Sequence, residues 1–268
     1  MRGLTDTSPE AERVLAEVYR RMTPARKWLL LEEVFRCAAA LQHAGRRLHG
    51  PRATNGPGPD PTASPDPLGQ KDGTMTQPEE ALKTVREVIA VFDRLGIRYA
   101  LGGSFASSLH GQPRLTRDAD IAVDPFPGRE PELLRSFGPD YYLSATAIDE
   151  AVRERRSFNI INTVTGFKVD VFVRGKRPFD QSLMERRTAI TLPDEPEHPV
   201  AFVTAEDIVL QKLEWYRLGG EVSERQWLDV LEVLRVRAGQ LDEAYLDRWA
   251  ADLGVADLLA RVRGELMP

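Results

Sequence analysis

The spacing of apolar residues separates the chain into a patterned body and a segment that has almost no apolar pattern. In the body, one stretch places apolar residues three or four positions apart (Leu82, Val85, Ile89, Phe92), which is the spacing of one helix face. Shorter runs rich in β-branched and aromatic residues predict strands. The expected strands are 97–101, 118–123, 157–162, 167–173 and one near 200–203.

Capping signals set the ends of the expected helices. Thr76 and Glu79 form a T-x-x-E capping box at the start of the first of them, and Gly96 suits the position after its end. Thr165-Gly166, between two predicted strands, indicates a hairpin. The remaining helices are expected at 105–110, 130–137, 145–155, 205–218, 223–238, 241–252 and 255–265. This order predicts an α+β fold, with a small mixed sheet and its helices in 76–203 and a helical C-terminal lobe in 204–268.

The segment before this body divides into two further parts. Residues 1–49 predict a two-helix unit, since Ser8-Pro9 and Thr23-Pro24 each place an N-cap residue before proline. Residues 50–75 predict a disordered linker, because eleven of the 24 residues from Gly50 to Gly73 are proline or glycine. Such a composition cannot offset the entropy of its own ordering.

Charge and cysteine content narrow the class of protein. The 268 residues carry a net charge of −5, so a nucleic-acid partner requires a local basic patch, and no DNA partner is predicted. The single Cys37 excludes an internal disulfide framework and fits a reducing compartment. No apolar run is long enough to span a bilayer, and the first residues lack a signal peptide, so a cytoplasmic location is expected.

Three aspartates are the first candidates for chemistry. Side chains alternate along a strand, so Asp118 and Asp120 project to one side, about 7 Å apart. Asp170 interrupts the apolar strand F-K-V-D-V-F-V, on the face opposite Phe167, Val169, Val171 and Val173. If the two strands are neighbours, three carboxylates converge, and oxygen ligands of this kind favour Mg²⁺, in a site suited to two ions. Alternatively, the first two are ordinary strand-edge acids and Asp170 pairs with a lysine or arginine.

A small-residue turn precedes these acids. Gly102 and Gly103 permit close approach of the backbone, and Ser104 begins a helix whose N–H groups can hold phosphate. Arg114 and Arg117 flank the first aspartate strand and are either phosphate contacts or solvated loop residues. His110 is expected to be structural, and the four tryptophans are expected to belong to helical core stripes rather than to a base-stacking surface.

The pattern G-G-S, then D-A-D-I, then a later strand aspartate resembles the polymerase-β-like nucleotidyltransferase superfamily over residues 97 to 173. The resemblance implies that Gly103 and Ser104 contact the NTP phosphates and that Asp118, Asp120 and Asp170 hold two Mg²⁺ ions. The segment TAEDIVLQKLEWYRLGGEVSERQWLDVLEVL resembles the AbiEii-type abortive-infection branch.

In that branch, a lysine and a later aspartate match Lys212 and Asp229 here. Lys212 shares a helical stripe with Ile208 and Trp215, so it is either a cation for the triphosphate or a lysine whose stem lies along apolar surface. Asp229 is either a support of the site or an exposed helix acid. Asp207 is expected to be a first-turn helix charge rather than a ligand.

The sequence says less about the acceptor of the nucleotide than about the reaction type. Residues 153–187 contain nine Lys or Arg and four Asp or Glu, a local balance of +5 that suits RNA such as tRNA or else a solvated face. The resemblance includes toxins that add nucleotides to tRNA, which implies a cognate antitoxin as partner. We therefore expect an Mg²⁺-dependent nucleotidyltransferase acting on RNA. The alternatives are a small-molecule or protein acceptor, and a silent scaffold that binds a partner.

Overall fold

The computed structural model describes residues 77–112, 116, 118–192 and 195–266, together with Glu10, Ala11, Val14 and Val18. Those four residues are helical. The other predictions for 1–49, the linker at 50–75 and the capping box at Thr76 lie outside the described residues.

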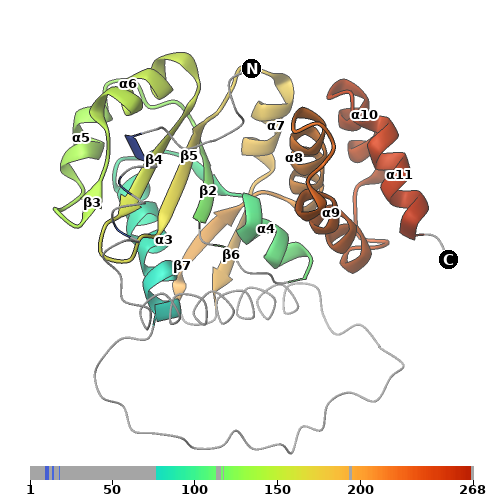
Figure 1. Ribbon diagram of the computed structural model, residues 1–268, viewed down its shortest axis with the longest axis horizontal. Helices are drawn as coiled ribbons and strands as arrows, with labels where there is room; N and C mark the ends of the chain where they lie inside the picture. Colours follow the sequence, from blue (N-terminus) through green and yellow to red (C-terminus); the bar gives the residue numbers. More distant parts are fainter. Residues whose placement is uncertain are drawn as a thin grey trace, which may run out of the picture.

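One seven-stranded mixed sheet lies at the centre of the described chain (Figure 1). Its strands are β1 (Tyr99–Leu101), β2 (Asp118–Val123), β3 (Tyr141–Tyr142), β4 (Ser157–Asn162), β5 (Lys168–Val173), β6 (Thr188–Leu192) and β7 (Glu195–Phe202). They are arranged in the order β3-β4-β5-β2-β1-β7-β6. The pairs β2·β5 and β1·β7 are parallel and the other pairs are antiparallel, so the expected mixed sheet is confirmed.

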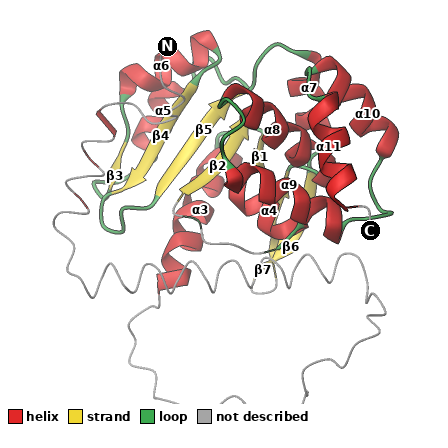
Figure 2. Ribbon diagram, turned by 45° about the vertical axis from the view of Figure 1, so that its right-hand side comes forward, coloured by secondary structure: helices red, strands yellow, loops and turns green. Residues whose placement is uncertain are grey.

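The helices fall into two groups. Those within the sheet region are α3 (Gln77–Arg94), α4 (Gly103–His110), α5 (Glu130–Arg135), α6 (Ala145–Glu154) and α7 (Pro178–Arg186). The C-terminal lobe comprises α8 (Ala205–Leu218), α9 (Glu224–Val236), α10 (Glu243–Asp252) and α11 (Ala256–Leu266). The lobe packs beside the sheet through contacts of α8 and α9 with α4, at the side away from α5 and α6 (Figures 1 and 2). The α+β fold with a helical C-terminal lobe is therefore as expected.

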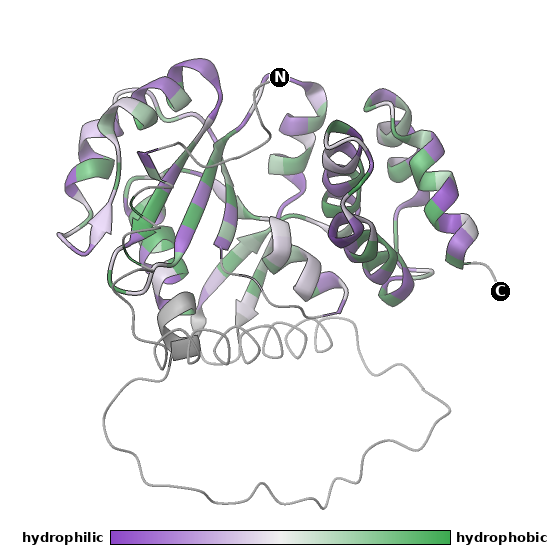
Figure 3. Ribbon diagram, viewed as in Figure 1, coloured by the Kyte–Doolittle hydropathy of each residue, from purple (hydrophilic) through white to green (hydrophobic). Residues whose placement is uncertain are grey.

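The apolar faces of both groups meet in one continuous core. Side chains of β2 alternate between this core and the opposite face, and the green bands of Figure 3 follow the strands and the inner helix faces. Phe92 of α3, Ile121 of β2, Val171 of β5 and Leu213 of α8 are all buried in it. Burying apolar side chains is the main stabilising contribution to such a fold. None of the helices in the described part of the chain has the length and apolar character needed to cross a bilayer.

Strands β3 and β6 and helix α7 were not predicted, and strand β7 is longer than the one expected near 200–203. The chain from Glu195 to Phe202 forms β7, although Pro196 and Pro199 argue against a strand there. Its pairing with β1 and β6 is tertiary, so it is invisible to a local pattern. Helix α7 was missed although Pro178 stands at its first position, and β3 is too short to show alternation.

Candidate functional site

The parallel pairing of β2 with β5 builds the centre of the site. Three register pairs lie on the face away from the core: Asp118 opposite Lys168, Asp120 opposite Asp170, and Ala122 opposite Phe172. The intervening residues, such as Ile121 and Val171, are fully buried. Asp118 and Asp120 thus share a face, as alternation predicts, and Asp170 lies beside them because the two strands are neighbours.

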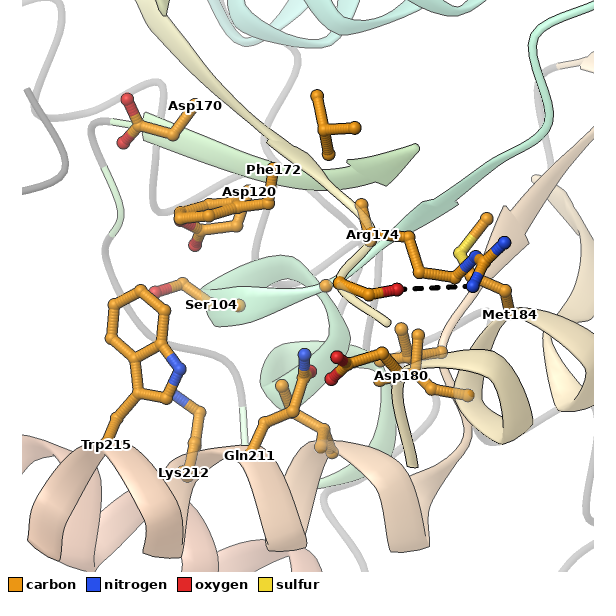
Figure 4. Close-up of a pocket in the computed structure, with 18 of the residues that line it drawn as sticks. Ser104, Asp120, Asp170, Phe172, Arg174, Asp180, Met184, Gln211, Lys212 and Trp215 are labelled. Carbon is orange, nitrogen blue, oxygen red and sulfur yellow. Dashed lines mark hydrogen bonds between the residues drawn. The ribbon is translucent and has the colours of Figure 1, made fainter. Parts of the chain in front are cut away.

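These residues line one cavity of about 710 Å³. Its walls come from β2 and β5, from the start of α4, from the loop that leads into α7, and from the start of α9 and one face of α8. Of the residues singled out in the sequence, the cavity is lined by Gly102, Gly103, Ser104, Asp118, Asp120, Asp170 and Lys212. Figure 4 shows Lys212 and Trp215 extending from α8 toward the strands that carry Asp120 and Asp170, with Ser104 between them. Arg114 and Arg117 lie outside the described residues.

The glycine turn is shaped by its contact with Asp120. Gly103 has φ +49°, a left-handed conformation that favours glycine, and a Cβ at this position would fall on the Asp120 carboxylate. The N–H of Gly102 donates to the backbone O of Asp120 at 2.8 Å, which ties the turn to β2. Ser104 follows in the first turn of α4 and is buried. The turn therefore holds the start of α4 directly against the acidic strand.

The aspartates repel one another in this enclosed place. Removal from bulk water raises the pKa of Asp120 to about 7, and the negative charges of Asp118 and Asp170 add to the increase, while Lys212 and Lys168 oppose it. Burial likewise raises the pKa of Asp170 to about 6, against the attraction of Lys168 and the hydrogen bond from Asn159. Two neighbouring carboxyls with pKa values this high mark a place where a cation would be favoured.

Lys168 already places one positive charge beside these carboxylates. Lys168 Nζ lies 2.6 Å from Oδ2 of Asp170, and Asn159 Nδ2 donates to Oδ1 of the same carboxylate at 2.6 Å. Thr116 donates to Asp118 Oδ1 at 2.9 Å. Among the residues that the structure describes, no three His, Cys, Asp or Glu side chains are arranged as a ready-made metal site. Asp170 therefore does pair with a lysine, as one of the two alternatives predicted. The three aspartates line one cavity, but they are not arranged as the ligands of a single metal ion.

Lys212 and Asp229 form a buried ion pair between α8 and α9. The Nζ of Lys212 lies 2.7 Å from Oδ2 of Asp229 and donates to Gln226 Oε1 at 3.0 Å. Both charged side chains are less than a tenth exposed. The alternative of an exposed helix acid at Asp229 is therefore wrong, since this carboxylate holds Lys212 where it lines the cavity.

The tryptophans are only partly as expected. Trp227 and Trp249 are buried in the lobe, but Trp215 is 38% exposed and lines the cavity, so assigning it to the core is wrong. Its ring meets Phe172 edge-on, at a centroid distance of 5.6 Å and an interplanar angle of 78°. A signal was present in the sequence, because Phe172 alternates onto the same face as Asp170 and Trp215 follows Lys212 by one helical turn. Trp28 lies outside the described residues.

Several charged residues near the site are structural. His110 is buried, with Nε2 2.9 Å from the backbone O of Val203, as expected for a structural histidine. Asp207 is in the first turn of α8 and is fully buried, where it accepts hydrogen bonds from Thr204 and Tyr245. These contacts hold α8 to α10 within the lobe, and α4 to the segment that follows β7, and neither residue lines the cavity.

Some of the basic side chains in segment 153–187 form ion pairs, and others have no ionic partner among the described residues. Arg174 pairs with Asp124, while Arg177 pairs with Asp180 and with Glu214 of α8. Lys176 lines the cavity, is exposed and has no ionic partner in the described part of the chain. Arg225, at the start of α9, lines the cavity in the same way. Lys176 and Arg225 thus bring positive charge to the cavity that no acidic side chain of the described residues pairs with.

No protein-family model matches the sequence, and a search of curated proteins found no significant match. Among solved structures, the chain is similar to the antibiotic-resistance factor ANT(2'')-Ia in solution, with 14% identity, 70% of this chain and 98% of that chain covered, and a TM-score of 0.40. A crystal structure of ANT(2")-Ia in complex with adenylyl-2"-tobramycin matches with 15% identity, 65% and 97% coverage and a TM-score of 0.38.

A nucleotidyltransferase-like protein from Paracoccidioides brasiliensis matches with 20% identity, 69% and 93% coverage and a TM-score of 0.40. Likenesses at this level are too distant to assign an activity.

Proposed function

We propose that this protein is a magnesium-dependent nucleotidyltransferase, which moves a nucleoside monophosphate from an NTP to an acceptor hydroxyl. The observation that carries the proposal is that Asp118, Asp120 and Asp170 line the same cavity as the Gly103-Ser104 helix start and Lys212. A helix N-terminus and a lysine stabilise phosphate charge, and carboxylates hold the divalent cation that accompanies a triphosphate.

The chemistry of the donor set fits Mg²⁺. All three candidate ligands are carboxylates. Burial raises the pKa of Asp120, the charges of Asp118 and Asp170 raise it further, and a divalent cation would relieve that repulsion. Two ions held by Asp118, Asp120 and Asp170 would neutralise the triphosphate and lower the pKa of the acceptor hydroxyl. The ligand types therefore suit Mg²⁺, but their positions do not form a ready-made metal site, because Lys168 already pairs with one oxygen of Asp170.

The transfer step is a substitution at the α-phosphorus. The acceptor oxygen forms a new bond to this phosphorus, the bond to the bridging oxygen breaks, and pyrophosphate leaves with that electron pair. The hydroxyl proton passes to Asp170, the carboxylate placed opposite Asp120 in the register. Ser104 and the first N–H groups of α4 donate to the phosphates, and Lys212, held by Asp229, balances the charge on the leaving group. Arg117 is a further predicted triphosphate contact.

The proposed acceptor is RNA, most simply tRNA. The support is the positive charge of Lys176 and Arg225, which line the cavity of an acidic protein and have no ionic partner among the residues that the structure describes. Phosphate contacts by such residues dominate nucleic-acid affinity. On this proposal the protein is the toxin of a cytoplasmic toxin–antitoxin pair, with a cognate antitoxin as partner. The support for that role is the resemblance of residues 204–234 to the AbiEii-type branch.

The test is a transfer assay with four labelled substrates. The protein is incubated with Mg²⁺, total RNA and each α-labelled NTP in turn, beside the variant Asp118→Ala/Asp120→Ala. Asp149→Ala is the matched control, because Asp149 is an exposed acid on α6. Label in tRNA that vanishes only in the double variant supports the proposal. Label in protein or in small molecules would show that the acceptor is not RNA. No transfer at all would favour a scaffold that binds a partner without catalysis.

A further inference from the structure

Phe172 and Trp215 are the two aromatic side chains among the described residues that line the cavity. They come from different elements, β5 and α8, and meet edge to face with ring centroids 5.6 Å apart. We call this pair the aromatic ledge. Such T-shaped contacts fix the orientation of both rings.

Trp215 is the most exposed of the three tryptophans that the structure describes. Trp227 and Trp249 are 8% and 5% exposed, whereas Trp215 is 38% exposed and opens onto the cavity. The indole N–H of Trp227 donates to Glu265, whereas the indole N–H groups of Trp215 and Trp249 have no hydrogen-bond partner among the described residues. Trp215 lines the cavity beside Phe172, so its indole offers the cavity a flat apolar surface on which a ring of a ligand can stack.

The ledge adjoins the charged part of the cavity. Phe172 follows Asp170 by two residues on the same face of β5, and Trp215 follows Lys212 by one turn of α8. Figure 4 shows Trp215 and Lys212 extending together from α8 toward Asp120, Asp170 and Phe172. A ligand that fills both parts therefore carries a flat apolar group joined to an anionic one.

We propose that the aromatic ledge is the subsite that stacks a nucleobase, an inference that rests on the proposed function for the identity of the attached phosphates. Every base presents a flat π-surface, so an exposed indole binds it without reading its sequence. The base belongs either to the NTP or to the 3′ end of an RNA acceptor. Stacking is the same chemistry in both cases, and binding experiments separate them.

The experiment measures binding by titration calorimetry, in Mg²⁺, for wild type, Trp215→Ala and Trp215→Phe. The probes are each NTP alone, inorganic tripolyphosphate and a trinucleotide RNA. The matched control is Leu218→Ala, because Leu218 lies on the same helix, is 62% exposed and does not line the cavity. Circular dichroism establishes that each variant is folded.

Trp215→Ala is expected to weaken binding of the NTPs or of the trinucleotide about 5- to 150-fold, which is the loss of one stacked base. Tripolyphosphate binding stays unchanged, and Trp215→Phe retains most of the affinity. The arm that responds identifies which base is stacked.

Equal weakening of tripolyphosphate, or no weakening of any base-containing probe, would overturn the inference. If wild type binds nucleotides through Trp215 but has no affinity for tripolyphosphate, the ledge stands and the proposed phosphate site fails. If tripolyphosphate binds but the bases add nothing that depends on Trp215, the ledge alone fails.

Discussion

The backbone of Gly103 lies directly against the carboxylate of Asp120, so closely that a methyl group on Gly103 would overlap it. This contact joins the two parts of the candidate site, the glycine turn at the start of α4 and the acidic strand β2. The left-handed φ of Gly103 adds a second requirement for glycine at the same position.

Replacing Gly103 by alanine is expected to displace the Asp120 side chain and to abolish nucleotidyl transfer, by at least about 100-fold. Gly254→Ala is the matched control, because Gly254 has a similar positive φ (+68°) with nothing near its added Cβ. The control is expected to cost only about 1 kcal/mol of stability and to keep its activity. Urea denaturation and the transfer assay measure both effects. Equal loss of activity in the two variants would mean that the conformation, not the contact, matters.

Variants of the Lys212–Asp229 pair can distinguish a role of Lys212 in stability from a role in phosphate binding. Lys212→Met leaves the buried Asp229 carboxylate without its partner, so it is expected to cost about 3–5 kcal/mol of unfolding free energy. Adding Asp229→Leu removes the stranded charge and is expected to restore much of that stability. The double variant should still fail to bind tripolyphosphate, because no ammonium remains at the cavity.

The control for this comparison is Lys83→Met, which breaks an exposed pair with Glu87 and is expected to cost less than about 1 kcal/mol. Tripolyphosphate affinity is measured by calorimetry and stability by urea denaturation. A double variant that regains both properties would show that Lys212 serves packing alone.

The raised pKa of Asp120 predicts how stability changes with pH in the absence of metal. This carboxyl binds its proton more tightly in the folded state, with a pKa of about 7, than in the unfolded chain, where the value is about 3.9. Its contribution to stability is therefore full below about pH 4 and is lost as the pH rises from there through 7. The charged form is the one that the fold disfavours.

Asp120→Asn cannot ionise, so in EDTA it is expected to be more stable than wild type at pH 8, by an amount on the order of 3 kcal/mol. The difference should shrink toward pH 5. Asp149→Asn, an exposed acid on α6, is the control and should show no such trend. Added Mg²⁺ should stabilise wild type more at pH 8 than at pH 6, and should not stabilise Asp120→Asn to the same extent. Denaturation curves at each pH that run parallel for the two proteins would contradict this prediction.

Local pattern was enough to predict several parts of the site. Alternation in D-A-D-I-A-V places Asp118 and Asp120 on one face whatever the neighbouring strand is, and β2 begins and ends where that pattern does. The helical spacing around Lys212 predicted α8, which runs over the expected residues. Gly102 and Gly103 were predicted to permit close approach of the backbone at the start of a helix, and the structure requires glycine at Gly103, where a Cβ would overlap the Asp120 carboxylate.

Partners that are distant in sequence were decided only by the tertiary structure. The parallel pairing of β2 with β5 sets Asp120 opposite Asp170 and brings Lys168 beside Asp118, which no periodicity in either strand specifies. The packing of α8 on α9 turns Lys212 and Asp229 into a buried pair, and the same helix leaves Trp215 in the cavity instead of in the core. The physical reason is that periodicity determines which side of an element a residue faces, whereas the neighbour on that side depends on how the whole chain buries its apolar surface.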